Sequence, residues 1–130
     1  MRRGELFNLQ WRDIDFRKRL VRVADSKNGE SREIPMNRTL EDTLKRIPWR
    51  LDLVFVFPGR TGRGLTNVRK RFMRALETAQ IEDFRFHDLR HTFASRLVIR
   101  GVDLTTVKEL MGHKSIEMTL RYAHSHPNIN

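Results

Sequence analysis

Several residue types that carry common protein chemistry are absent or scarce in this chain of 130 residues. It has no cysteine, which excludes disulfides, thiolate metal sites and cysteine nucleophiles and fits a reducing, cytoplasmic compartment. Its longest apolar run, residues 53–57, is five residues long, whereas a transmembrane helix needs roughly 20. Tyrosine occurs once, as Tyr122. We therefore expect no membrane partner, and any tyrosine chemistry must use this one residue.

Acidic residues are also few relative to basic ones. The 26 lysines and arginines outnumber the 16 aspartates and glutamates, which gives a formal net charge of +10. Of the basic residues, 20 are arginine and 6 are lysine, and arginine binds phosphate oxygens with a planar, two-pronged donor. This excess predicts a polyanionic partner. The hydrophobic fraction of 38% is enough for one modest core, and the length favours a single domain.

The first half of the sequence reads as a small antiparallel sheet. Residues 20–24 and 32–36 are strand candidates on either side of a loop that contains Asn28-Gly29, a strong hairpin signal. Lys27 therefore lies at or beside the hairpin tip. The apolar residues 53–57 predict a third, buried strand, and residues 39–47 predict a short helix that Pro48 ends.

The remaining pattern is helical. Residues 3–8 resemble the end of a helix, and apolar residues from position 66 onward recur at helical spacing. Further helices are predicted over residues 87–100, over 104–111 with Asp103 as cap and Gly112 as stop, and over 115–122. On the helix at 87–100, Leu89, Phe93 and Leu97 form the apolar stripe. The fold class is α+β, a small antiparallel sheet with a helical bundle.

His87 and Arg90 are three residues apart at a predicted helix start, so both side chains project to one side. Such a pair suits a phosphodiester, because arginine binds a non-bridging oxygen and histidine exchanges a proton near neutral pH. A surface ion-pair residue and a capping histidine are the alternative. His87 and His91 also have the four-residue spacing of a zinc site, but no third ligand follows at a known spacing. We expect His91 to be a structural residue that packs against the sheet.

Tyr122 has two interpretations. A tyrosine on a short polar helix is commonly half-buried packing, but a phenolate can attack a phosphate where cations surround it, and this chain is rich in cations.

Five short motifs, taken together, resemble the tyrosine recombinase (phage integrase) family. They are Met-Arg-Arg-Gly-Glu-Leu at residues 1–6, Asp-Ser-Lys-Asn-Gly at 25–29, His-Asp-Leu-Arg-His-Thr-Phe-Ala at 87–94, Leu-Met-Gly-His at 110–113 and Arg-Tyr-Ala-His at 121–124. Their order and spacing extend over nearly the whole chain. Arg2, and not Arg3, matches the first arginine of the family.

The resemblance implies catalytic roles for six residues of these motifs and a supporting role for a seventh. Tyr122 would attack the scissile DNA phosphate to give a 3′-phosphotyrosyl link, and Arg2 and Arg90 would hold the non-bridging oxygens. Lys27 would protonate the leaving 5′-oxygen. His87 would accept the proton of Tyr122, and His113 would donate a hydrogen bond to the phosphate. Glu5 would orient Arg2, as structural support or otherwise. The resemblance implies no cofactor, neither metal nor nucleotide, and no small-molecule substrate.

The resemblance also implies the wider setting. We expect a catalytic-domain fragment, residues 1–130, without the amino-terminal DNA-binding domain of the family, weakly active alone and encoded by a bacterium, archaeon or phage. The partner is double-stranded DNA, and the full-length family acts as a homotetramer on paired sites. The basic residues Arg69, Lys70, Arg71 and Arg74 either contact the DNA backbone or form a solvated helix face. Two alternatives remain open: a type IB topoisomerase-like relaxer and a non-catalytic DNA-binding module.

Overall fold

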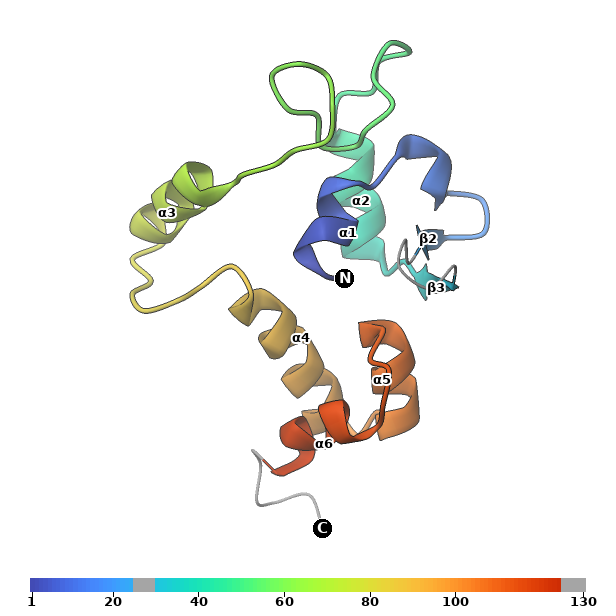
Figure 1. Ribbon diagram of the computed structural model, residues 1–130, viewed down its shortest axis with the longest axis vertical. Helices are drawn as coiled ribbons and strands as arrows, with labels where there is room; N and C mark the ends of the chain where they lie inside the picture. The colour runs from blue at the N-terminus through green and yellow to red at the C-terminus, as the bar shows by residue number, and fades with distance from the viewer. Residues whose placement is uncertain (25–29, 125–130) are drawn as a thin grey trace. The chain divides into compact units, whose positions relative to one another are not determined.

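A computed structural model describes residues 1–24 and 30–124 (Figure 1). The chain divides into two compact units, Arg2–Asn67 and Val68–Asn130, with Met1 assigned to the second. The loop expected to carry Lys27, residues 25–29, lies outside the described residues.

The first unit contains a three-stranded antiparallel sheet in the order β1-β2-β3, formed by β1 (Ile14–Asp15), β2 (Leu20–Ala24) and β3 (Ser31–Pro35). The predicted hairpin is confirmed: β2 has the expected bounds, and β3 begins one residue earlier than expected. Val21 and Val23 of β2 are both 3% exposed and alternate with exposed residues, as expected for a strand with one buried face.

The prediction of a third strand at residues 53–57 is wrong. In the described part of the chain, these residues form a single isolated bridge, between Phe55 and Gln10. Two backbone bonds hold the segment in place, from Trp11 N to Val54 O (3.0 Å) and from Val56 N to Leu9 O (2.9 Å). The apolar run correctly indicated burial, since Val56 is 1% exposed. The third strand is β1, which is too short and too polar to be recognised from its sequence.

Two helices complete this unit. Helix α1 spans Arg3–Phe7, and α2 spans Arg38–Arg46 after Asn37, whose side chain accepts a hydrogen bond from Leu40 N (2.8 Å). Such an N-cap satisfies one of the free backbone donors of the first turn. A short 3₁₀ helix, Trp11–Asp13, precedes β1. The buried residues of the unit are Phe7, Leu9, Val21, Val23, Met36, Leu44 and Val56.

The second unit is helical, with α3 (Arg69–Thr78), α4 (Asp88–Ile99), α5 (Leu104–Met111) and α6 (Glu117–His124). Helices α4, α5 and α6 contact one another pairwise and form a compact group (Figure 1). Its core consists of Ala94, Val98, Val107, Met111 and Tyr122, against which Leu97, Val102 and Leu104 pack. In the part of the chain that the structure describes, no helix has the length and apolarity to cross a membrane.

The predicted ends of α5 are confirmed. The Asp103 side chain accepts from Thr106 N at 2.8 Å, and Gly112 ends the helix with φ +68°, a conformation that glycine adopts without steric cost. The predicted stripe on α4 is wrong for two residues, since Leu89 and Phe93 are 48% and 46% exposed. Helix α4 has apolar residues around most of its circumference, so periodicity did not identify the face that meets the core.

Candidate active site

Four predicted site residues, His87, Arg90, His113 and Tyr122, belong to the helical group α4–α6 and the turns beside it. The other two described ones, Arg2 and its partner Glu5, belong to the first unit.

Tyr122 is a core residue of the helical group. Its side chain is 5% exposed, and its ring packs with the aliphatic residues of α4 and α5. The hydroxyl oxygen of Tyr122 lies 2.7 Å from Nδ1 of His91. A tyrosine buried in this way keeps its ring fixed by packing and its hydroxyl fixed by a hydrogen bond, so both interpretations of Tyr122, packing and reactive group, rest on the same placement.

His91 is the histidine expected to pack against the sheet, and the structure shows its ring in contact with two residues of its own unit. Its ring centroid lies 5.8 Å from that of Tyr122 and 4.7 Å from that of His87, to which it is edge-on. His87 and His91 are one helical turn apart, so they share one side of α4. The signal that could have found His91 is the pair of histidines at i and i+4, which was weighed as zinc spacing. In the described ranges no three histidine, aspartate or glutamate side chains gather in a way that could hold a metal ion.

Arg90 reaches from α4 to the end of α5. One terminal guanidinium nitrogen donates to the backbone carbonyl of Met111, at 2.5 Å. That carbonyl directly precedes the Gly112 turn, so Arg90 ties the site histidine of the turn, His113, to α4. Because a carbonyl carries no net charge, this bond fixes the guanidinium without neutralising it.

His113 lies in the turn between α5 and α6. It is 9% exposed, and its Nδ1 lies 2.8 Å from the hydroxyl of Thr119, itself fully buried. Its ring is nearly parallel to that of Tyr122, with an interplanar angle of 4° and centroids 6.2 Å apart. His113 and Tyr122 are thus neighbours in space, although eight residues of the turn and of α6 lie between them in the sequence.

In the first unit, Glu5 contacts two arginines. Its carboxylate accepts from Arg2 N at 2.7 Å and lies 3.4 Å from a terminal guanidinium nitrogen of Arg2. Arg32, on β3, donates to both oxygens at 3.0 and 2.8 Å. Glu5 therefore contacts Arg2, which the resemblance implies that it orients, but its shortest bonds to another side chain are to Arg32, which the sequence did not single out.

This pair changes the titration of Glu5. Burial raises its pKa, but the hydrogen bonds from Arg32 and the Arg2 backbone, together with the charge of Arg32, outweigh burial and lower the pKa from 4.5 to about 2. Glu5 is therefore ionised across the physiological pH range.

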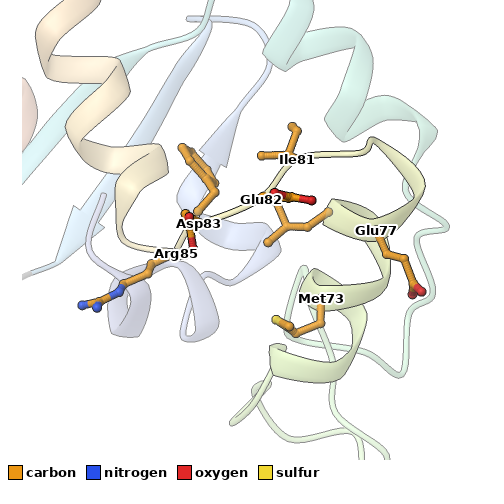
Figure 2. A pocket seen from close by; sticks show the side chains of 8 residues that line it. Met73, Glu77, Ile81, Glu82, Asp83 and Arg85 are labelled. Carbon is orange, nitrogen blue, oxygen red and sulfur yellow. The ribbon is translucent and has the colours of Figure 1, made fainter.

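An open pocket of about 830 Å³ lies between α3 and the segment that leads to α4 (Figure 2). Three carboxylates, Glu77, Glu82 and Asp83, and one arginine, Arg85, line it beside the exposed apolar side chains of Met73 and Ile81. Among the site residues that the structure describes, none lines it. Carboxylates repel phosphate, so a DNA-facing role does not suit this pocket.

The fold is that of tyrosine recombinase catalytic domains. The Tn1549 transposon integrase, solved with a circular intermediate DNA, is 26% identical with a TM-score of 0.80 over 94% of this chain and 49% of that one. The XerA recombinase is 27% identical with a TM-score of 0.80, over 97% and 48%. The catalytic domain of bacteriophage HP1 integrase is 29% identical with a TM-score of 0.69, over 99% and 70%.

The sequence comparisons agree. The chain belongs to the phage integrase family, whose model matches residues 1–128. It is 38% identical to the integrase of Salmonella phage P22 over 98% of this chain and 37% of that protein. It is 35% identical to a shufflon-specific DNA recombinase of Escherichia coli over 95% and 31%, respectively. The chain thus spans about a third of the length of these relatives.

Proposed function

We propose that this chain is the catalytic domain of a site-specific DNA recombinase that cleaves and rejoins strands through Tyr122. In the first step the tyrosine oxygen forms a bond to the scissile phosphorus, and the bond from phosphorus to the 5′-oxygen breaks. The products are a 3′-phosphotyrosyl link and a free 5′-hydroxyl. In the second step a 5′-hydroxyl of another strand attacks the link and releases the tyrosine, so no external energy source is consumed.

The observation that carries this proposal is the placement of Tyr122. Its hydroxyl is hydrogen-bonded to an imidazole nitrogen at 2.7 Å, and its ring lies parallel to that of His113. A tyrosine that served packing alone would need one hydrogen-bond partner for its hydroxyl, which His91 supplies. Packing alone does not require His113 and Arg90 in the same group of three helices. Proton acceptors and a cation beside a phenol favour attack on a phosphate.

Arg90 and His113 are proposed to bind the phosphate. Arg90 is held by the Met111 carbonyl, so its orientation is set before the substrate arrives. The Nδ1 atom of His113 is engaged by Thr119, so a hydrogen bond to a phosphate oxygen is made through Nε2. Donors fixed in advance stabilise the charge that develops in the transition state, typically by several kcal/mol.

Arg2, Lys27 and His87 complete the proposed set. Arg2 binds a second non-bridging oxygen and is oriented by Glu5, with which it forms two contacts. Lys27 protonates the leaving 5′-oxygen. His87, whose ring edge lies against His91, exchanges protons within the site.

The proposed substrate is double-stranded DNA, in keeping with the net charge of +10. Among the structural neighbours, the Tn1549 integrase and the XerH recombinase were solved on DNA. Assembly as a homotetramer on paired sites, and exchange between two duplexes, are proposed for the complete protein that carries this domain.

Covalent trapping tests the proposal. The chain is incubated with a pool of duplexes of randomised sequence, each nicked so that the short 5′-hydroxyl fragment diffuses away after cleavage. Denaturing gel electrophoresis then separates protein linked to DNA, and the linked duplexes are sequenced. We expect an adduct that is enriched in one sequence and absent for Tyr122→Phe, which keeps the ring and removes the hydroxyl.

Two controls separate the competing functions. Binding is measured first by filter retention, because a chain that binds DNA strongly and forms no adduct would be a non-catalytic DNA-binding module. Relaxation of supercoiled plasmid, measured beside recombination of a two-site plasmid, distinguishes a relaxer from a recombinase. An adduct formed equally well by Tyr122→Phe would refute the proposed nucleophile.

A further inference from the structure

We propose that His91, rather than His87, accepts the proton of Tyr122 when this residue attacks DNA. The inference rests on the proposed function and assigns one of its steps to a residue for which the resemblance implies no role.

The first support is direct geometry. The 2.7 Å separation between His91 Nδ1 and the Tyr122 oxygen is that of a short hydrogen bond. A general base must lie within hydrogen-bond reach of the proton that it removes. His91 satisfies this condition.

The second support is the rigidity of both partners. The Tyr122 ring is packed in the core with Val107 and Met111, and His91 is the fourth residue of α4. Close packing fixes the ring, and the helix backbone fixes the imidazole, so the bond does not depend on a mobile loop. Reacting groups held in advance need no reorganisation at the moment of proton transfer.

The third support is the surrounding charge. His87 contacts the His91 ring from the preceding turn of α4, and His113 stacks on the far partner, Tyr122. Arg90 is the adjacent residue of α4 and binds the end of α5. Two imidazoles, those of His87 and His113, thus contact the His91–Tyr122 pair, and Arg90 is the neighbouring residue of His91 on α4. The guanidinium is permanently charged, and its positive charge favours the phenolate once the proton has left.

The proton balance of the step is simple. As the Tyr122 oxygen bonds to phosphorus, its proton moves to Nδ1 of His91, which becomes an imidazolium. The proton on the leaving 5′-oxygen comes from Lys27. In rejoining, the attacking 5′-hydroxyl gives its proton to Lys27, and the imidazolium returns its proton to the departing Tyr122 oxygen, so all three residues finish as they began.

The first arm of the test is spectroscopic and needs no DNA. In a chain labelled with ¹⁵N-histidine, imidazole nitrogens that carry hydrogen have chemical shifts distinct from those of bare nitrogens. We expect Nδ1 of His91 to be bare at pH 8 and its shift to change in Tyr122→Phe. A hydrogen on Nδ1 would make His91 the donor to Tyr122 and overturn the inference.

The second arm measures single-turnover adduct formation on the duplex that the trapping experiment selects. His91→Asn keeps a polar group near the position of Nδ1 but cannot take up a proton. We expect at least a roughly 100-fold lower rate, the lower end of typical general-base contributions, and loss of the histidine-dependent rise of rate with pH. His124→Asn, an exposed histidine of α6, is the matched control and keeps the parent rate.

Two measurements separate a chemical defect from a folding defect. Far-ultraviolet circular dichroism shows whether each variant is folded, and His91→Gln is a second variant that cannot take up a proton. The inference is overturned if a folded His91→Asn variant reacts within threefold of the parent, which would leave His91 as a positioning residue. It falls with the proposed function if the parent binds DNA and forms no adduct. The two failures are therefore distinct, since the first occurs with an active parent.

Discussion

In the unit Arg2–Asn67, Arg32 places two guanidinium nitrogens on the two oxygens of Glu5, whereas in the helical unit Arg90 donates to the uncharged carbonyl of Met111. The first arrangement cancels charge and joins α1 to β3. The second fixes a guanidinium through a partner that carries no charge of its own. Arginines that look alike in a basic sequence therefore serve two purposes, and the chemistry of the partner separates them.

Among the variants considered, Arg90→Ala is expected to have the largest effect, a loss in the rate of adduct formation. If Arg90 stabilises the transition state, the rate of adduct formation falls by about 10²- to 10³-fold, while the free energy of unfolding falls by only about 1 kcal/mol for the lost hydrogen bond. The rate is measured with the selected nicked duplex, and the stability by urea unfolding.

Two further variants sharpen this result. Arg90→Lys keeps the charge and loses the planar donor, so it should remain strongly impaired. Arg96→Ala, at an exposed position of the same helix, should react at the parent rate. A loss of stability at position 90 large enough to account for the lost activity would erase the contrast between the two arginines.

Arg32→Ala should produce the opposite pattern. Glu5 is 10% exposed, and removal of its main partner leaves a nearly buried carboxylate, which costs about 3 kcal/mol. The matched control is Arg22→Ala, whose partner Glu33 is 3.6 Å away and whose side chain is 65% exposed. Exposed pairs of this kind contribute about 0.5 kcal/mol. Equal losses for the two variants in urea unfolding would contradict the assigned role of the Glu5–Arg32 pair.

The same pair predicts an acid dependence of stability. The pKa of Glu5 is lowered by folding from 4.5 to about 2, so its contribution is complete above pH 4.5 and is lost as the pH falls toward 2. The loss is about 2 kcal/mol, after allowance for partial solvent screening. Unfolding by urea between pH 2 and 6 measures it, and Glu5→Gln should remove this part of the slope.

Local features of the fold could be predicted from the sequence, whereas contacts between distant residues could not. The ends of α5 were predictable, because Asp103 and Gly112 act on backbone groups within a few residues of themselves. The third strand and the buried face of α4 were not predictable, because apolar residues indicate burial but do not indicate which part of the chain packs against them. The contacts Glu5–Arg32 and His91–Tyr122 span 27 and 31 residues, and no periodic signal connects positions so far apart.

The smallest effect concerns α3, where charge of both signs occurs on one helix. Arg71 lies two positions before Met73, a residue of the pocket, so the two side chains point to nearly opposite sides of the helix. If Arg71 contacts a DNA phosphate, Arg71→Ala lowers the slope of log affinity against log salt by about 0.9. Titrations by fluorescence anisotropy at several salt concentrations measure the slope.

Glu77→Gln, on the rim of the acidic pocket, is the control for α3. It should leave the salt slope unchanged, because the pocket does not suit phosphate. If Glu77→Gln changed the slope of log affinity against log salt as much as Arg71→Ala, both residues would act only through long-range electrostatics. The Arg71 side of α3 and the pocket would then not differ in their contact with DNA.

The packing of Tyr122 has a consequence for how the protein can be altered. The residue proposed to attack DNA is also one of the five buried residues of its helical core, so selection for reactivity and selection for thermal robustness act on one position. Substitutions that loosen α6 to speed the chemistry weaken the fold, and substitutions that tighten it restrain the nucleophile. A variant library directed at the neighbours of Tyr122 should therefore yield a trade-off between turnover and melting temperature.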